Sequence, residues 1–142
     1  MDNKKQKTTI TNNPKETRDL AAKFAGRLKG GEIIALTGTL GAGKTVFVKG
    51  LAQGLGMPEK GVRSPSFVIL MEHRQGRLPL FHFDFYRFEN GAEIDTTPFA
   101  DCLKEKGVIV VEWPERIAEY LPLGTRRVTI EVLGKKTRKI IL

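Results

Sequence analysis

The sequence predicts an α/β domain of three layers, built around a mixed and partly parallel sheet. Two short apolar runs, Glu32–Thr37 and Val108–Val111, are typical of strands that are buried on both faces. A glycine-rich segment follows the first run and leads into an amphipathic helical pattern. Two alternating runs close the chain and predict an antiparallel hairpin, so the sheet is expected to be mixed.

The length of 142 residues suits a single domain, which we expect over residues 10–142 after a basic N-terminal tail at residues 1–9. Hydrophobic residues make up 40% of the chain and charged residues 28%, a balance that excludes a disordered class. Lysine and arginine outnumber acidic residues by 24 to 16, which gives a net charge of +8. This excess fits a polyanionic partner such as nucleic acid, and it fits a solvated basic surface equally well.

The sequence favours a cytoplasmic location and no membrane partner. Cys102 is the single cysteine, so it cannot form an internal disulfide, and a reducing compartment suits it. No apolar run approaches the length of a membrane span. The charged N-terminus, MDNKKQKTT, has no apolar stretch after it and therefore does not resemble a secretory signal.

The first helix is expected to begin at Asn13-Pro14. Asparagine is a good N-cap, proline suits the first helical position, and Glu16 lies three residues after the cap. Apolar residues at helical spacing continue this helix as far as Gly30-Gly31. A short strand is expected to begin at Ile10, just before the helix.

The rest of the chain alternates between strand-like and helical runs. A helix is predicted over Lys44–Leu55, and Gly56-Met57-Pro58 stops it. Ser66–His73 and Leu78–Asp84 are predicted to pair as a hairpin. The remaining expected elements are a partly helical stretch at Ala92–Lys106, the strand Val108–Val111, a short helix at Pro114–Tyr120, and a closing hairpin of Arg126–Leu133 and Thr137–Leu142.

Residues 38–45 read GTLGAGKT and match the pattern G-x-x-x-x-G-K-[ST] at every fixed position. Consecutive backbone N–H groups in a tight loop can surround phosphate oxygens when glycines keep side chains clear. The helix that follows turns its partially positive N-terminus toward the same phosphates. We therefore expect ATP or a related nucleotide here, with Lys44 at the β- and γ-phosphates and the Thr45 hydroxyl at Mg²⁺. The expected nucleotide-binding residues of the loop are Gly38, Thr39, Leu40, Gly41, Ala42, Gly43, Lys44 and Thr45.

Two carboxylates are candidates for the metal site and for catalysis. Asp84 ends the apolar run that begins at Leu80, and Glu112 ends Val108–Val111. Acidic residues at the carboxyl ends of such strands are expected near the ligand in open α/β sheets. Either residue could bind Mg²⁺ directly, hold a water molecule of its shell, or orient the attacking water.

Other polar residues carry weaker signals. A hydroxyl in Ser64-Pro65-Ser66 could reach Mg²⁺ or the γ-phosphate, although an ordinary turn explains this segment slightly better. His73 and His82 lack partners at metal-binding spacing, so packed or surface histidines are expected. Trp113 suits a core position, a base-stacking face or an interface, and the pattern favours none of these.

Longer segments resemble one family. GEIIALTGTLGAGKT, VRSPSFVI, PLFHFDFYR, VIVVEWPER and LGKKTRKIIL, in this order, resemble the bacterial ATPases of tRNA threonylcarbamoyladenosine biosynthesis, the TsaE or YjeE family. The likeness runs from Thr17 to Leu142, and its HxDxYR and VEWPE parts are more specific than the glycine-rich loop. It implies a cytoplasmic ATPase with a P-loop NTPase-like fold and two partner proteins, TsaD and TsaB. Contact with tRNA would be indirect, through the complex.

The resemblance also implies roles for single residues. Thr45 and Glu112 match the family's Mg²⁺ residues, and Asp84 matches an acidic residue of its active site. Thr17 matches a threonine near the nucleotide, while Ser66 lies in a switch-like segment where the usual SPTF is SPSF. The expected catalytic residues are Lys44, Asp84 and Glu112, the expected metal residues are Thr45, Glu112 and Asp84, and Thr17, Ser66 and Trp113 join the loop in the nucleotide site.

The expected function is that of a Mg²⁺-dependent ATPase that acts as a turnover or assembly switch on the TsaD–TsaB complex. Its hydrolysis of ATP to ADP and phosphate is expected to be slow in isolation, because no arginine finger can be named in the chain. A small-molecule kinase of the same loop class is the alternative, although the chain has little spare length for an acceptor pocket and a lid. A third class, a nucleic-acid-binding module, would require strong tRNA binding by this chain alone. The pattern does not distinguish ATP from GTP.

Overall fold

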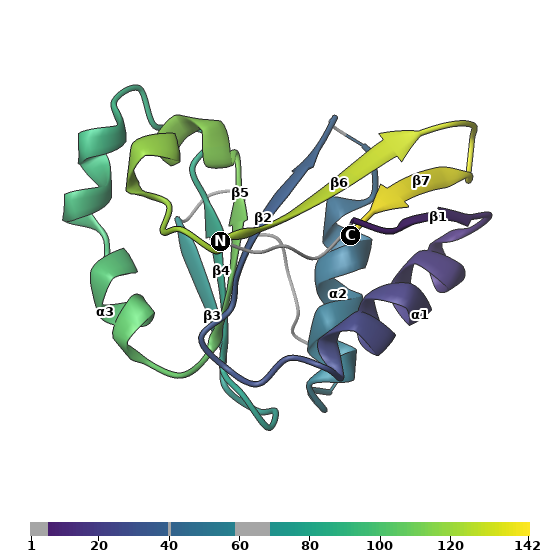
Figure 1. Ribbon diagram of the computed structural model, residues 1–142, viewed down its shortest axis with the longest axis horizontal. Helices are drawn as coiled ribbons and strands as arrows, with labels where there is room; N and C mark the ends of the chain where they lie inside the picture. The colour runs from purple at the N-terminus through teal and green to yellow at the C-terminus, as the bar shows by residue number, and fades with distance from the viewer. Residues whose placement is uncertain (1–5, 40, 59–68) are drawn as a thin grey trace.

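The computed structural model describes residues 6–39, 41–58 and 69–142 (Figure 1). Its strands are β1 (Thr8–Thr11), β2 (Ile33–Gly38), β3 (Leu70–His73), β4 (Leu80–Asp84), β5 (Val108–Glu112), β6 (Arg126–Val132) and β7 (Arg138–Ile141). Its α-helices are α1 (Pro14–Ala25), α2 (Lys44–Gly54) and α3 (Phe99–Lys104), and its 3₁₀-helices are η1 (Gly91–Thr96) and η2 (Pro114–Tyr120).

The strands form one mixed sheet in the order β1-β7-β6-β2-β5-β4-β3. The central pairs β6–β2, β2–β5 and β5–β4 are parallel, and the pairs toward both edges are antiparallel. The α/β class with a mixed and partly parallel sheet is therefore confirmed.

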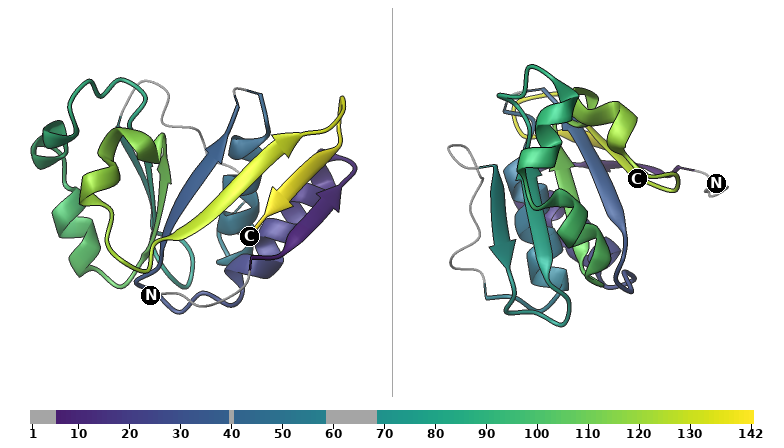
Figure 2. Two further views of the ribbon diagram at one scale, coloured as in Figure 1. Left: turned by 45° about the horizontal axis from the view of Figure 1, so that its top comes forward. Right: turned by 90° about the vertical axis from the view of Figure 1, so that its left-hand side faces the viewer.

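Helices cover both faces of this sheet, which makes three layers. α1 and α2 pack on one face, while η1, α3 and η2 lie on the other face beside β3, β4 and β5 (Figure 1). Alternate residues of the buried strands point to opposite faces of the sheet. Ile34 and Val110 pack in the core under α1 and α2, whereas Ile33 and Val111 pack in the core on the α3 side. In the left view of Figure 2, β6 and β7 lie in front of α1 and α2. None of the helices among the described residues is long and apolar enough to span a bilayer.

The start of α1 forms as the sequence predicts. Asn13 is the N-cap, and its side chain accepts a hydrogen bond from the Glu16 amide at 2.9 Å. Glu16 in turn accepts a hydrogen bond from the Asn12 amide at 2.9 Å. These local bonds satisfy helix-end donors without help from distant residues, which is why the sequence alone could locate them.

The end of α1 and the start of β1 differ from the expected positions. α1 ends at Ala25, and Gly26 follows as the C-cap instead of Gly30-Gly31. Glycine has a low helix propensity, so the helix stops at the first one available. Leu28 is still buried, because the chain turns back toward the core. β1 begins at Thr8 and pairs with β7, so the sheet includes two residues that were expected in the basic tail.

Other differences concern the limits of strands and the type of one helix. β3 begins at Leu70, and the earlier part of its predicted run lies outside the described residues. β4 begins at Leu80 and not at Leu78, which lengthens the turn between the two strands. The predicted helix at Pro114–Tyr120 has the expected bounds and is a 3₁₀-helix.

α1 and α2 cross closely at two glycines of α2. A Cβ atom added at Gly50 would collide with the Arg18 carbonyl oxygen and with the Ala21 side chain. At Gly54 the added atom would collide with the Ala22 carbonyl oxygen. The missing side chains therefore allow the two backbones to approach, and this contact sets the position of α2 on the sheet.

Replacing Gly50 by alanine should lower the free energy of unfolding by about 1–3 kcal/mol, because the added methyl group overpacks the helix crossing. Alanine's better helix propensity, about 1 kcal/mol, offsets only part of this cost. Urea denaturation measures the change. Lys49→Ala, at the exposed neighbouring position, is the control and should be nearly neutral. Equal stability of the two variants would contradict the close crossing.

Candidate functional site

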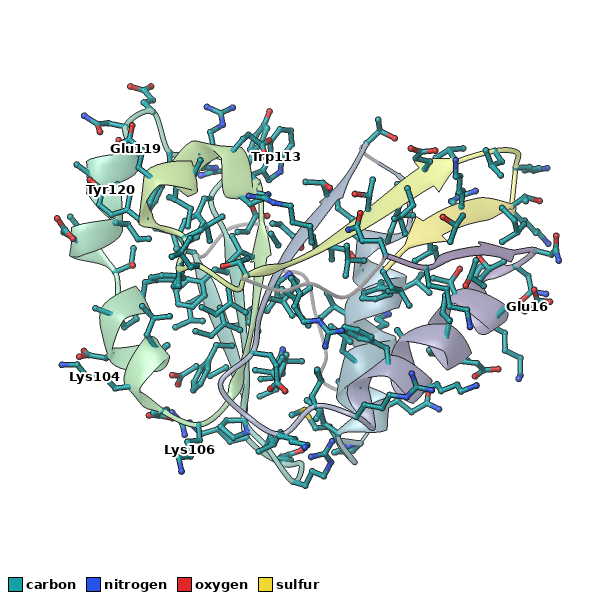
Figure 3. All side chains as sticks on the ribbon, in the orientation of Figure 1. Glu16, Lys104, Lys106, Trp113, Glu119 and Tyr120 are labelled. Atoms are coloured by element: carbon teal, nitrogen blue, oxygen red, sulfur yellow. The ribbon has the colours of Figure 1, made fainter. Side chains whose placement is uncertain are left out.

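The predicted site residues meet at one edge of the sheet, where the parallel strands end. Gly38 ends β2, Asp84 ends β4 and Glu112 ends β5, and Asp84 lies beside Glu112 in the register of the sheet. Figure 3 shows Trp113 at this edge, whereas Lys106, which precedes β5, lies at the opposite edge. Residues that are far apart in the sequence therefore form one cluster, as expected for the carboxyl edge of such a sheet.

The loop of residues 38–45 has a backbone that depends on glycine. Gly41 and Gly43 have φ angles of 81° and 101°, in a region that side chains with a Cβ atom seldom enter. At Gly38 an added Cβ would lie 2.9 Å from the Ile130 carbonyl oxygen and 3.2 Å from the Ala42 side chain. The loop is thus folded tightly over the end of β2. Leu40, one of its predicted binding residues, lies outside the described residues.

α2 begins at Lys44, within the last two residues of this loop. The Ala42 amide donates to the Thr39 carbonyl at 2.9 Å, and the Phe47 amide donates to the Gly43 carbonyl at 3.0 Å. Gly43 is the N-cap and supplies no side-chain hydrogen bond to the helix. The first amides of a helix lack partners inside it, so this end has the donors and the partial positive charge that an anion requires.

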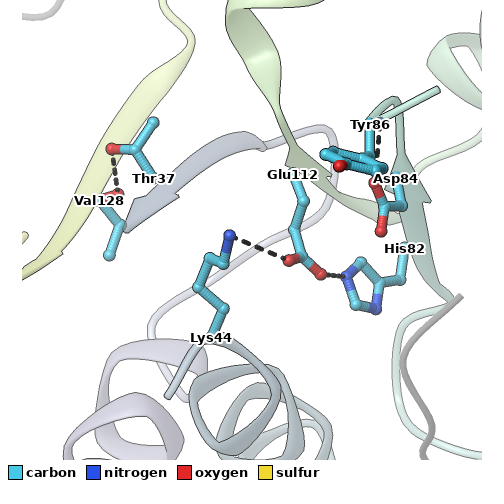
Figure 4. A network of polar contacts seen from close by, with 7 residues as sticks. All are labelled: Thr37, Lys44, His82, Asp84, Tyr86, Glu112 and Val128. Atoms are coloured by element: carbon cyan, nitrogen blue, oxygen red, sulfur yellow. Dashed lines mark hydrogen bonds and ion pairs between the residues drawn. The ribbon is translucent and has the colours of Figure 1, made fainter. Parts of the chain in front are cut away.

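Glu112 lies between a cation and an imidazole (Figure 4). Its Oε1 is 3.7 Å from Lys44 Nζ, and its Oε2 is 2.5 Å from His82 Nε2. The side chains of Glu112 and Lys44 are only 7% and 11% exposed, and His82 is fully buried. His82 thus contacts Glu112 through Nε2, and its other ring nitrogen, Nδ1, has no hydrogen-bond partner among the described residues.

The two carboxyl groups at this edge have pKa values that shift in opposite directions. Burial acts to raise the pKa of Glu112, but the hydrogen bond with His82 and the charges of His82 and Lys44 outweigh it and lower the pKa. Burial raises the pKa of Asp84, the nearby Glu112 raises it further, and a hydrogen bond from the Tyr86 amide opposes the rise. Glu112 is therefore the firmly ionised group, and Asp84 is the better proton acceptor of the pair.

The strand around Asp84 has two different faces. Phe81, Phe83 and Phe85 point into the core on the α3 side, where Phe83 stacks on Phe85 with ring centroids 5.5 Å apart. His82 and Asp84 alternate with them and face the site. Asp84 Oδ1 accepts a hydrogen bond from the Tyr86 amide at 2.9 Å, which fixes the carboxylate at the end of the strand.

Trp113 adopts a strained backbone conformation directly after Glu112. Its φ and ψ are 57° and 50°, and it is the one non-glycine residue with positive φ among the described residues. Its ring centroid lies 5.2 Å from Lys44 Nζ and 4.9 Å from the Tyr86 ring centroid. Arg116 lies 5.7 Å from the same ring. Strain of this kind is retained where the surroundings require a particular side-chain position.

Two of the remaining predicted residues, Thr17 and Thr45, lie on helices. Thr17 is buried in α1, and its hydroxyl lies 2.7 Å from that of Thr11 in β1. Thr45 is half-buried in the first turn of α2. Ser64 and Ser66 fall outside the described residues. Nucleotide-binding roles for Thr17 and Ser66 stay predictions.

Two residues of the site were not singled out from the sequence. His82 was expected as a packed or surface histidine; it is packed, and it also contacts Glu112. Its position two residues before Asp84 on one strand could have placed it on the same face. Arg138, at the start of β7, donates from Nε to the Ala42 carbonyl at 2.8 Å. No sequence signal pairs two residues so far apart.

The fold and the loop at its carboxyl edge define a P-loop NTPase-like α/β domain. A family profile described as "Threonylcarbamoyl adenosine biosynthesis protein TsaE" matches residues 11–140. The chain therefore belongs to the TsaE family, which takes part in tRNA threonylcarbamoyladenosine biosynthesis.

Individual relatives agree with this assignment. The TsaE protein of Bacillus subtilis is 40% identical over 136 residues, which cover 96% of this chain and 84% of that protein. The TsaE protein of Treponema pallidum is 42% identical over 113 residues, covering 80% of this chain and 82% of that protein. The crystal structure of Bacillus subtilis YdiB superposes with a TM-score of 0.83 at 37% identity, covering 96% of this chain and 84% of that one.

Asp84→Asn and Glu112→Gln should change stability in opposite directions at neutral pH. The pKa of Glu112 in the folded state is below its ordinary value of 4.5, so ionised Glu112 stabilises the fold above that pH. Glu112→Gln should therefore destabilise by about 1–3 kcal/mol at neutral pH. This loss should shrink as the pH falls below 4.5, through the lowered pKa.

The pKa of Asp84 is raised above its ordinary value of 3.8, so its ionised form disfavours the fold. Asp84→Asn should stabilise at neutral pH, and this gain should vanish as the pH falls to 3.8. Urea denaturation of both variants across this pH range provides the measurement, and each variant is the charge-matched control for the other. The same sign for both changes at neutral pH would contradict the opposite pKa shifts.

Proposed function

We propose that this protein is a Mg²⁺-dependent ATPase that acts as a turnover or assembly switch on the TsaD–TsaB complex during tRNA threonylcarbamoyladenosine synthesis. One observation carries the proposal. A buried, ionised carboxylate, Glu112, lies against Lys44 at the point where the glycine-rich loop meets the N-terminus of α2. A site with anion donors, a cation and an adjacent carboxylate suits a phosphate group together with its metal ion.

The loop and Lys44 would bind the phosphates. The backbone amides of Gly43, Lys44 and Thr45 and the partial positive charge of α2 supply donors that need no rearrangement of side chains. The Lys44 ammonium is already held at this edge by Glu112 and by the Trp113 ring. Its separation of 3.7 Å from Glu112 Oε1 is longer than a direct hydrogen bond, so a phosphate oxygen can compete for it.

The side chains at this edge fit Mg²⁺. This ion prefers oxygen ligands and usually takes one or two carboxylates in addition to the phosphates of its nucleotide. Thr45 offers a hydroxyl, Glu112 offers an ionised carboxylate, and Asp84 lies beside Glu112 in the adjacent strand. When bound, the ion would neutralise charge on the phosphates.

Asp84 would orient the attacking water. Its raised pKa makes it a better proton acceptor than an exposed aspartate, and the Tyr86 amide fixes its carboxylate. Catalysis would then consist of positioning and charge stabilisation, which suits phosphoryl transfer. An arginine or another cation from a partner would complete the site, so TsaD and TsaB are the expected activators.

Lys44→Ala should abolish MgATP binding and hydrolysis while the chain stays folded, because the variant lacks the cation that faces the β- and γ-phosphates. Titration of Trp113 fluorescence measures binding, since this single tryptophan lies beside Lys44. Lys49→Ala changes an exposed lysine of the same helix and is the matched control. Normal ATPase activity of Lys44→Ala would refute the phosphate-site assignment.

Phosphate release by the isolated protein should be slow and should rise by at least about tenfold when TsaD and TsaB are added together, because partners supply missing catalytic groups. A complex containing the Lys44→Ala variant is the control for ATPase activity from other components. A high rate in isolation that the partners leave unchanged would argue against a switch. Transfer of the γ-phosphate to a nucleoside or sugar would favour a kinase instead.

A further inference from the structure

Arg138 connects the closing hairpin to the glycine-rich loop. Its Nε donates to the Ala42 carbonyl at 2.8 Å, and its Nη2 lies 3.4 Å from the Gly41 carbonyl oxygen. These contacts join residues that are 96 and 97 positions apart in the chain. On its other side the same guanidinium donates from Nη1 to the carbonyls of Gly134 at 2.9 Å, Thr137 at 3.0 Å and Lys135 at 3.5 Å.

The guanidinium is suited to this double contact. It is planar and permanently charged, and its donors point in fixed directions, so it can hold two backbone segments at once. The half-buried side chain has backbone carbonyls of the loop and of the hairpin as partners, and it forms no ion pair with a carboxylate of the described residues. Within the described part of the chain, no ion pair neutralises the positive charge of Arg138, which therefore acts on the loop.

The contact at Ala42 fixes the direction of the next amide. In a trans peptide the C=O and N–H groups point to opposite sides of the chain. Because Arg138 holds the Ala42 carbonyl, the Gly43 N–H points away from Arg138. A cation at the carbonyl end also polarises this peptide and makes its N–H a stronger donor. Gly43 has a φ of 101° and, as a glycine, could otherwise adopt several backbone conformations.

We propose that Arg138 is a positioning residue of the phosphate site, which holds the Ala42–Gly43 peptide so that the Gly43 N–H faces the bound phosphates. The inference rests on the proposed nucleotide binding and adds a residue from the C-terminal hairpin to that site. Arg138 acts through the backbone of the loop and does not touch the nucleotide. Without it, the loop must lose conformational freedom when the phosphates bind, and affinity falls.

The neighbouring residue provides a matched comparison. Lys139 carries the same charge on the same strand, but its side chain points to the opposite face of the sheet. There its Nζ lies 3.8 Å from a carboxylate oxygen of Glu131, and it has no hydrogen bond or ion pair with the described residues of the loop. Lys139→Ala therefore removes one positive charge from the hairpin and leaves the Ala42 contact in place.

The test compares MgATP affinity, measured by Trp113 fluorescence, for Arg138→Ala and Lys139→Ala, with thermal melting recorded for both. We expect Arg138→Ala to bind at least about tenfold more weakly, the loss typical of a charge-assisted hydrogen bond. Lys139→Ala should bind as the unsubstituted protein does. Added guanidinium ion at a non-denaturing concentration should restore part of the affinity of Arg138→Ala, while the same concentration of sodium chloride should not.

The Arg138→Lys variant replaces Arg138→Ala in this affinity test if the alanine variant does not fold. Lysine keeps the charge but lacks the fork that reaches both the loop and the hairpin turn, so its affinity should lie below that of the unsubstituted protein. Affinity equal to that of Lys139→Ala in either Arg138 variant would overturn the proposal. If the unsubstituted protein and Lys139→Ala also fail to bind MgATP, the proposed ATPase function itself is wrong.

Discussion

The site depends on the interactions that stabilise the buried carboxylate of Glu112. Removing a charged group from water costs several kcal/mol unless partners compensate for it, about the scale of a domain's whole stability. Lys44 and His82 provide that compensation, and each comes from a different element. The pairing therefore requires that α2, β4 and β5 hold fixed relative positions. The register of β4 and β5 pairs His82 with Val110 and Asp84 with Glu112, so the His82 side chain reaches Glu112 diagonally across the two strands. The start of α2 places Lys44 on the other side of the same carboxylate.

The two layers of helices support this arrangement from opposite sides. On one side the close crossing of α1 and α2 at Gly50 fixes the helix that carries Lys44. On the other side the phenylalanines of β4 pack in the core, with Phe83 and Phe99 in edge-to-face contact at 5.3 Å. His82 and Asp84 alternate with these rings, so a rigid core holds the polar face of the strand. Arg138 adds a third support, from the hairpin to the loop.

Several features of this edge reduce the stability of the fold without improving the packing of the core. Trp113 has a positive φ, Asp84 is partly buried with a raised pKa, and His82 keeps an unpartnered ring nitrogen among the described residues. Such costs persist where the surrounding structure imposes them, and they tend to gather at functional sites. Their concentration beside the glycine-rich loop supports the proposal that this edge binds nucleotide and metal.

The sequence by itself determined what depends on neighbouring residues: the eight-residue loop, the Asn13 cap of α1, the buried strands, and the carboxylates that end two of them. Hydrophobic periodicity and turn-forming residues within short segments are enough to predict these features, and the family resemblance agreed with them. The tertiary structure alone decided that His82 contacts Glu112, that β1 begins at Thr8 to pair with β7, and that Arg138 reaches Ala42. A pattern of apolar and polar residues encodes which face a side chain takes. It does not encode strand order or register, and these determine which distant groups meet.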